Sequence, residues 1–452
     1  MRYKTLQIFL ILTLIPGIFQ TSFAQYNYIQ YKFLNLPENR FKHLKDSTNF
    51  NHVMNQFSNI CFGKKEQINI VHLGNSHIQG GFLPNELKTN FQNYFLNDTM
   101  AHAGFIFPYE VAGTNTPSHY TSSATGTWIP CQATKDTSCS LGASGLSVST
   151  QDTTASVSVK LKPVNPFKDP SFSSVKILCE NIDSSYLIRT IPEARKMKRD
   201  SLGYLFHFAN PTDSLELILT RKDPGDSSVF ILHGFVPGNH SAVNYYALGV
   251  NGAKAKSYLR CDHFQEQLKY LSPDWLIISL GTNEAYNKNY PKEQFSVHLT
   301  KLIKQVRKHN PGIWILLTTP GDAMRSNQKN PNNKIAGEKI IHIAKENHCS
   351  YWNFYQLMGG EGSVERWNEN DLTAGDRLHL NKQGYILKAN LFFDAFLHTF
   401  LPYLNKQTLK NKSLSGVPER HICLFQRRAH AFYKTLFLGI LHRCAHFLQL
   451  PP

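Results

Sequence analysis

Apolar and polar residues follow two patterns along this chain, and the first is that of alternating strands and helices. Apolar runs of strand length are each followed by a longer stretch in which apolar residues recur every three or four positions, as on one side of a helix. This pattern covers residues 66–100 and returns over 262–403. Because buried parallel strands are apolar along their whole length, it predicts a parallel sheet with helices on both faces. The predicted strands are 68–74, 274–281, 312–320 and 351–356, and the predicted helices are 84–95, 292–310, 334–348 and 382–401.

The second pattern is an alternation of single apolar and polar residues, and it lies between the two α/β stretches. The clearest cases are 156–162 and 214–220. Pro, Gly, Asn and Asp separate the runs, and no helical stretch of any length interrupts them. These features predict an antiparallel β-sandwich. Because α/β texture flanks it on both sides, we expect a domain inserted within a single α/β domain.

The first residues have the pattern of a secretory signal peptide. The basic "MRYKT" precedes the apolar "LQIFLILTLIPGIF", and Ser22 and Ala24 occupy the small-residue positions before a cut after Ala24. We therefore expect export to the periplasm or the cell exterior. The alternative is an uncleaved membrane anchor, for which the apolar run is short. The predicted parts are 1–24 (signal peptide), 25–109 (first α/β part), 110–240 (β-insert), 241–403 (second α/β part) and 404–452 (basic tail).

Composition and charge restrict the partners. The 452 residues are 41% hydrophobic and 18% charged, as in a soluble globular protein, and the formal net charge is +16. This excess favours an anionic partner such as a cell-wall polymer. The basic tail suggests contact with a membrane surface, although its apolar stretch is equally suited to packing on the body of the protein. No nucleic-acid recognition motif occurs. The eight cysteines include one pair close in sequence, Cys131 and Cys139, and show no zinc-site spacing, so no metal or other cofactor is expected.

Two stretches suggest a nucleophile and a base. In "VHLGNSHIQGG" (71–81), Ser76 lies in a Gly-x-Ser turn between a predicted strand and helix, where its Oγ and N–H face the same crevice. In "GDRLHLNKQGY" (375–385), Asp376 and His379 are three residues apart, so the carboxylate can bind the imidazole Nδ1–H and leave Nε2 free to deprotonate a serine. Either motif alone is weak; a Gly-x-Ser turn is usually only a turn.

Two further stretches suggest hydrogen-bond donors. In "ALGVNGAKA" (247–255), Gly252 can bring its N–H close to a substrate oxygen because it has no Cβ. In "LIISLGTNEAY" (276–286), Asn283 follows a strand, and its amide can point into the crevice at the carboxyl edge of the sheet. An oxyanion hole needs donors of this kind.

In this order, the four stretches resemble the motif blocks of the SGNH (GDSL-type) hydrolase family. The resemblance implies a flavodoxin-like parallel sheet and a serine esterase without a cofactor. Ser76 would be the nucleophile, His379 the general base and acid, and Asp376 the residue that orients it. The N–H groups of Ser76 and Gly252 and the amide of Asn283 would form the oxyanion hole.

A narrower resemblance is to bacterial peptidoglycan O-acetylesterases. It is carried by "NSHIQGG", by the β-rich insert between the first and second blocks, and by "SLGTNEAY" followed by "MGGEGSVERW". It implies removal of O-acetyl groups from cell-wall glycan through an acetyl-enzyme, with an insert like a carbohydrate-binding module. Two alternatives stay open: a deacetylase or lipase acting on another acylated polysaccharide or lipid, and a non-catalytic glycan-binding protein with a degraded hydrolase domain.

The chain departs from the family pattern at two positions. Asn75 stands where the family usually has Asp, and Glu284 stands where Asp is commoner in the third block. The motif Asp accepts backbone hydrogen bonds that brace the nucleophile turn. The Asn Oδ1 can accept them too, without a charge, so we expect activity to survive.

Overall fold

The structure is a computed structural model, and it describes residues 30–45, 47–64, 66–95, 103–135, 138–163, 169–180, 185–238 and 241–412. The predicted signal peptide and residues 413–452 of the predicted tail lie outside the described residues. Among the described residues, no helix has the length and apolar character needed to cross a membrane.

A six-stranded sheet forms the centre of the α/β part, in the order β1-β18-β15-β14-β2-β13. Five strands are parallel, and the short edge strand β1 pairs antiparallel with β18. The strands are β1 (Phe41–Lys42), β2 (Ile68–Gly74), β13 (Val243–Gly249), β14 (Trp275–Ser279), β15 (Trp314–Thr318) and β18 (Ser350–Trp352). The predicted parallel sheet is confirmed.

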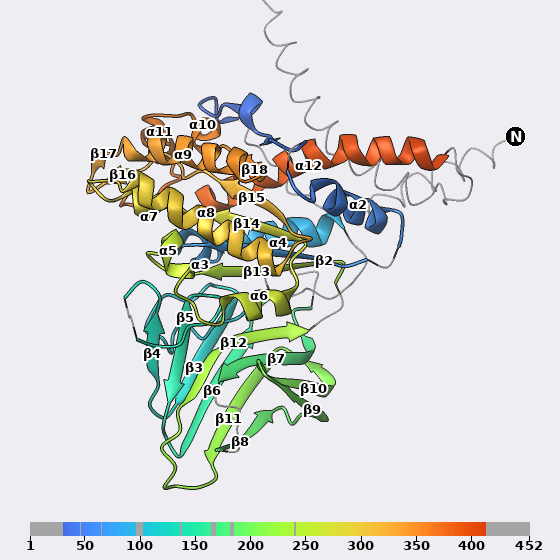
Figure 1. Ribbon diagram of the computed structural model, residues 1–452, viewed down its shortest axis with the longest axis vertical. Coiled ribbons are helices and arrows are strands. Elements are labelled where there is room, and N and C mark those ends of the chain that lie inside the picture. Colours follow the sequence, from blue (N-terminus) through green and yellow to red (C-terminus); the bar gives the residue numbers. More distant parts are fainter. Residues whose placement is uncertain are drawn as a thin grey trace, which may run out of the picture. The chain divides into compact units, whose positions relative to one another are not determined.

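Helices cover both faces of this sheet because successive strand residues point to opposite sides (Figure 1). The Trp275 ring lies 6.4 Å from the ring of Phe57 and 5.8 Å from that of Phe91, on the face covered by α2 (Phe50–Cys61), α4 (Phe82–Tyr94) and α12 (Lys382–Lys412). The next residue, Leu276, belongs to the core cluster that contains Leu299 and Ile340 of the opposite face. That face is covered by α5 (Ala255–Tyr258), α6 (Phe264–Leu271), α8 (Lys292–His309) and α9 (Asn332–Glu346).

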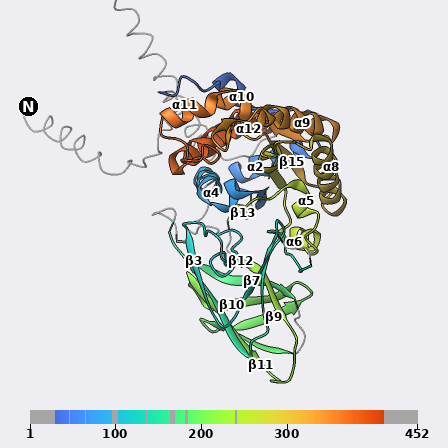
Figure 2. The same ribbon diagram turned by 90° about the vertical axis from the view of Figure 1, so that its left-hand side faces the viewer.

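The β-rich part consists of two antiparallel sheets that share one buried core (Figures 1 and 2). Their orders are β4-β5-β12-β7-β10-β9 and β3-β6-β11-β8. Leu215 and Leu217 of β11 pair with Val159 and Val157 of β6, and all four side chains are buried, so the alternation predicted from the sequence is confirmed. The strands are β3 (Tyr120–Thr125), β4 (Ile129–Gln132), β5 (Leu146–Thr150), β6 (Thr154–Leu161), β7 (Phe172–Glu180), β8 (Tyr186–Ile191), β9 (Lys196–Asp200), β10 (Gly203–Thr212), β11 (Ser214–Arg221) and β12 (Phe230–Gly238).

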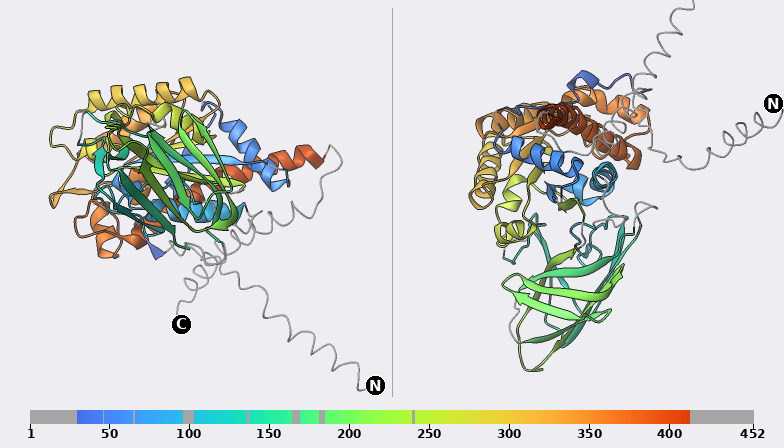
Figure 3. Two further views of the ribbon diagram at one scale, coloured as in Figure 1. Left: turned by 90° about the horizontal axis from the view of Figure 1, so that it is seen from below. Right: turned by 90° about the vertical axis from the view of Figure 1, so that its right-hand side faces the viewer.

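Three local expectations need adjustment. The run 351–356 is not one strand: β18 ends at Trp352, and Asn353 then accepts the N–H of Gln356 and caps α10 (Phe354–Met358). Strand β13 was not predicted, yet it returns the chain from the β-rich part to the parallel sheet. The helix expected to end at residue 401 continues as α12 to Lys412, beside α2 (Figure 3), so the described residues beyond 403 are helical.

The remaining described elements are short. The disulfide Cys131–Cys139 closes the loop between β4 and β5, and Cys61, Cys179, Cys261 and Cys349 are buried free thiols. The short elements are η2 (Leu36–Glu38), α3 (Ser76–Gln79), α7 (Thr282–Ala285), α11 (Ser363–Glu369), β16 (Met324–Arg325) and β17 (Gln328–Lys329).

Candidate active site

Ser76 stands at the first position of α3, directly after β2 reaches the carboxyl edge of the sheet. Asn75 caps this helix: its side chain accepts the N–H of His77 at 3.1 Å. Asn75 is almost fully buried, and its Nδ2 has no hydrogen-bond partner among the described residues. The uncharged Asn75 therefore still braces the turn through its Oδ1 atom.

Ser76, His379 and Asp376 form a continuous row of hydrogen bonds. Ser76 Oγ lies 2.9 Å from His379 Nε2, and His379 Nδ1 lies 2.7 Å from Asp376 Oδ2. The other carboxylate oxygen of Asp376 accepts the N–H groups of Leu378 and His379, both at 2.9 Å. Partial burial alone would raise the pKa of Asp376, but these hydrogen bonds lower it overall, so the carboxylate stays charged.

Gly252 lies at the same edge of the sheet as Ser76. The end of β13 pairs with the end of β2, Gly249 opposite Gly74, and the chain then turns through Gly252 with φ +76°, a conformation that favours glycine. The one predicted stretch that had no predicted strand before it therefore follows an unrecognised strand. In the described part of the chain, neither the Ser76 N–H nor the Gly252 N–H has a hydrogen-bond partner.

Asn283 lies beside this turn. Its Nδ2 donates to the carbonyl oxygen of Ala253 at 2.9 Å, which uses one of the two amide hydrogens. The neighbouring Glu284 is buried and accepts the N–H of Ala255 at 2.8 Å. Burial raises the pKa of Glu284, and hydrogen bonds from backbone N–H groups oppose that rise. Glu284 was noted only as a departure from the family pattern; its structural role is to anchor the 253–255 loop to α7.

His77 and Tyr385 are two neighbours of this row to which sequence reasoning gave no role. His77 Nδ1 lies 2.7 Å from the Tyr385 hydroxyl, and the His77 ring lies 5.1 Å from the ring of His379. Withdrawal from water, together with the charge of Lys388, lowers the pKa of His77 well below 6.5. A neutral His77 thus supports one side of the His379 ring. No sequence signal links His77 to Tyr385, which is 308 positions away.

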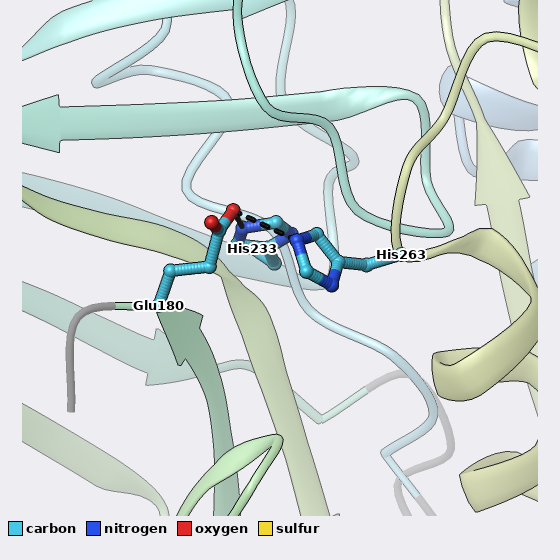
Figure 4. A group of neighbouring side chains, drawn as sticks. All are labelled: Glu180, His233 and His263. Carbon is cyan, nitrogen blue, oxygen red and sulfur yellow. Dashed lines mark hydrogen bonds and ion pairs between the residues drawn. The ribbon is translucent and has the colours of Figure 1, made fainter.

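A second group of side chains has ligand types that suit a metal: Glu180, His233 and His263 (Figure 4). Glu180 Oε1 lies 2.8 Å from His233 Nε2 and 3.1 Å from His263 Nε2. Ser140 also donates to this oxygen. The group joins β7 and β12 of the β-rich part to the start of α6.

The surroundings of His233 favour a proton at this group over a metal. Gln267 Oε1 accepts the N–H of Ala143 at 2.8 Å, so the amide presents its Nε2 hydrogen to His233 Nδ1, 3.1 Å away. His233 Nδ1 is then an acceptor, and the ring proton sits on Nε2 and points at Glu180. A neutral imidazole that binds a metal through Nε2 needs its proton on Nδ1 with an acceptor opposite. We therefore assign no metal to this group.

Comparison with known proteins agrees with the arrangement at the sheet edge. Residues 231–387 match the model of the GDSL-like lipase/acylhydrolase family, a range that contains Gly252, Asn283, Asp376 and His379 but begins after Ser76. A solved peptidoglycan O-acetylesterase matches with a TM-score of 0.65 at 17% identity, over 77% of this chain and 96% of its own, and so shares the fold. No curated protein matches the chain.

Two other solved structures match over about a third of this chain. One is an acetyl xylan esterase, with 22% identity, 34% of this chain, 81% of its own and a TM-score of 0.29. The other is a lipase/acylhydrolase from Enterococcus faecalis, with 18% identity, 33% of this chain, 73% of its own and a TM-score of 0.27.

Proposed function

The chain carries a GDSL-like lipase/acylhydrolase domain, and from this premise we propose that it is an exported serine esterase that removes O-acetyl groups from cell-wall peptidoglycan. One observation carries the proposal: hydrogen bonds of 2.9 Å and 2.7 Å join Ser76, His379 and Asp376 at the sheet edge where Gly252 and Asn283 also lie. The fold shared with a peptidoglycan O-acetylesterase supports the choice of substrate.

In the proposed first step, Ser76 Oγ attacks the acetyl carbonyl carbon while His379 Nε2 takes its proton. Asp376 holds the proton of His379 on Nδ1 and stabilises the imidazolium that forms. The carbonyl oxygen becomes an oxyanion, and it would accept hydrogen bonds from the N–H groups of Ser76 and Gly252 and from the second amide hydrogen of Asn283. Preorganised donors of this kind lower the barrier because they need no reorientation during the reaction.

Collapse of the tetrahedral intermediate breaks the bond to the sugar oxygen, which leaves as an alcohol after taking the proton from His379. The acetyl group remains on Ser76 as an ester. Water then gives a proton to His379 and attacks this ester, and the second intermediate releases acetate and restores Ser76. No cofactor enters either half of the reaction.

The test is acetate release from O-acetylated peptidoglycan by the wild type and by Ser76→Ala. We expect Ser76→Ala to reduce kcat by about 10³-fold or more. The matched control is Ser149→Ala in β5, whose hydroxyl bonds only the carbonyl of Ile129; it should match the wild type. Equal release by the wild type and Ser76→Ala would overturn the proposal.

A substrate panel separates the alternatives. Acetylated xylan, a chromogenic acetate ester and a long-chain ester are compared with O-acetylated peptidoglycan. Preference for xylan or for the long-chain ester would keep the chemistry and change the substrate. Glycan binding without hydrolysis of any ester would favour a non-catalytic glycan-binding protein.

A further inference from the structure

Gln79 ends α3, three residues after Ser76, and its side-chain amide binds two other segments. The side chain is almost fully buried. Its Oε1 accepts the N–H of Asn251 at 2.7 Å, directly before Gly252. Its Nε2 donates to Thr114 Oγ1 and to the carbonyl oxygen of Asn115, both at 3.0 Å. Gln79 therefore links the nucleophile helix to the Gly252 turn and to the segment that leads into the β-rich part.

The Asn251 side chain closes this polar group. Its Nδ2 donates to Asn115 Oδ1 at 2.6 Å and lies 3.2 Å from Thr114 Oγ1. The backbone N–H and the side chain of Asn251 are thus both fixed, the N–H by Gln79 and the side chain by Thr114 and Asn115.

Backbone packing leaves little freedom between α3 and the end of β13. A Cβ atom added to Gly249 would lie 2.5 Å from Gln79 N and 3.0 Å from the carbonyl oxygen of Asn75. Such contacts are shorter than side chains tolerate, so the absence of a side chain at Gly249 lets α3 lie directly against β13. This close approach brings the Gln79 amide within reach of Asn251.

The Gly252 turn is anchored on both sides and free in the middle. On the far side, Asn283 donates to the carbonyl oxygen of Ala253 and Glu284 accepts the N–H of Ala255. On the near side the Gln79–Asn251 hydrogen bond is the short contact, since the Val250 N–H reaches Gly74 O only at 3.5 Å. Without Gln79, the peptide groups before Gly252 would be free to rotate.

We propose that Gln79 is a positioning residue that holds the N–H of Gly252 in a fixed place relative to the N–H of Ser76. The two backbone donors then act on one oxyanion. This inference rests on the proposed esterase function. Because an oxyanion forms only during the reaction, loss of Gln79 affects the transition state more than substrate binding.

The test compares Gln79→Met, which removes both hydrogen-bonding groups, with Gln79→Glu, which keeps an acceptor for the Asn251 N–H. On a chromogenic acetate ester we expect Gln79→Met to lower kcat about 10- to 100-fold, less than complete loss of an oxyanion donor, with KM changed less than about threefold. Gln79→Glu should retain kcat within about fivefold. Asn115→Ala is the matched control, because it leaves the bond from Gln79 to Asn251 in place; it should keep the wild-type kcat.

A second readout separates positioning from a merely structural role. Methylboronic acid forms a tetrahedral adduct with a nucleophilic serine, and one of its oxygens occupies the oxyanion position. Gln79→Met should weaken its inhibition by the same factor as kcat. A Gln79→Met protein with wild-type kcat, or one with reduced kcat but unchanged boronate inhibition, would overturn the inference. If Gln79→Met does not fold, Gln79→Glu decides, and a loss of kcat greater than about 100-fold would overturn it.

Failure of this inference is distinguishable from failure of the proposed function. If the wild type hydrolyses the ester and Ser76→Ala does not, the esterase function stands, and a fully active Gln79→Met removes only the role of Gln79. If the wild type is inactive, or Ser76→Ala is as active as the wild type, the proposed function fails and this inference fails with it.

Discussion

Two regions of this molecule use the same chemistry, a carboxylate hydrogen-bonded to imidazole, and differ in what the other ring nitrogen meets. In the row at the sheet edge, Asp376 binds His379 Nδ1, and Nε2 faces the hydroxyl of Ser76. In the second group, Glu180 binds Nε2 of the fully buried His233, and Nδ1 is occupied by Gln267. One ring is available to move a proton to or from a ligand, and the other is closed off by protein on both sides. Residue types alone do not distinguish the two; the partner at the second nitrogen does.

The largest expected difference concerns the two histidines. We expect His379→Gln to lower kcat by about 10⁴-fold or more, because no other side chain faces Ser76 Oγ to take its proton. His233→Gln should leave kcat within about twofold and lower the thermal midpoint instead. Acetate release and thermal unfolding are measured on both variants. The comparison breaks if His233→Gln loses activity while remaining folded.

The two carboxylates give the next difference. Asp376→Asn removes the acceptor that fixes the His379 tautomer, and we expect kcat to fall about 10²- to 10⁴-fold. Glu180→Gln should leave kcat unchanged, and its loss of charged hydrogen bonds to His233 and His263 should cost about 1–3 kcal/mol of unfolding free energy. Denaturant unfolding and kcat are measured side by side. A comparable loss of kcat in both variants would count against the distinction.

The regions also differ in how their buried polar atoms are paired, and Asn75 tests this. Asn75→Asp restores the residue usual in the family, but the new oxygen would lie where Asn75 Nδ2 has no partner in the described structure. We expect kcat to stay within about fivefold, and the free energy of unfolding to fall by about 1–3 kcal/mol because a buried charged oxygen gains no donor. A gain in both activity and stability would show that the asparagine is a defect of this chain.

Much of this arrangement is readable from the sequence because its signals are local. The Asp-x-x-His spacing puts Asp376 and His379 within one turn of chain, and the alternation over 156–162 and 214–220 follows directly from the pleat of a strand. The bonds between Gln79 and Asn251 and between His77 and Tyr385 join segments 172 and 308 positions apart, and no periodicity reports such pairs. Strand β13 escaped prediction because its polar Asn244 and its position right after the β-rich part hide its membership of the parallel sheet.

A pH titration of stability should respond to the second group. The hydrogen bond from Glu180 raises the pKa of His263 above 6.5; partial burial opposes this, and Glu180 and Glu266 add to it by their charge. A raised folded pKa adds stability that is complete below pH 6.5 and is lost as the pH rises through the folded pKa. The thermal midpoint of the wild type should therefore exceed that of His263→Gln by about 2–4 °C at pH 6 and by less at pH 8. The lowered pKa of His233 acts in both proteins and cancels in the difference. A difference that grows with pH would contradict the assigned proton.

The smallest expected effect is that of added metal, and it decides whether the second group is a proton site. Gln267 cannot accept a hydrogen bond from His233 Nδ1 without turning its amide, which would face an NH₂ group toward the N–H of Ala143 and leave that donor unpaired. The group therefore holds its proton between Glu180 and the two rings at no such cost. We expect stoichiometric Zn²⁺, or EDTA, to shift the thermal midpoint of the wild type by less than about 1 °C, since a metal bound only to the folded state would raise it with concentration. Glu180→Gln, measured in the same buffers, reports any effect of zinc elsewhere on the chain. A zinc-dependent rise in the wild type that Glu180→Gln lacks would make this group a metal centre, and the contrast with the Ser76 row would then be between a metal site and a proton relay.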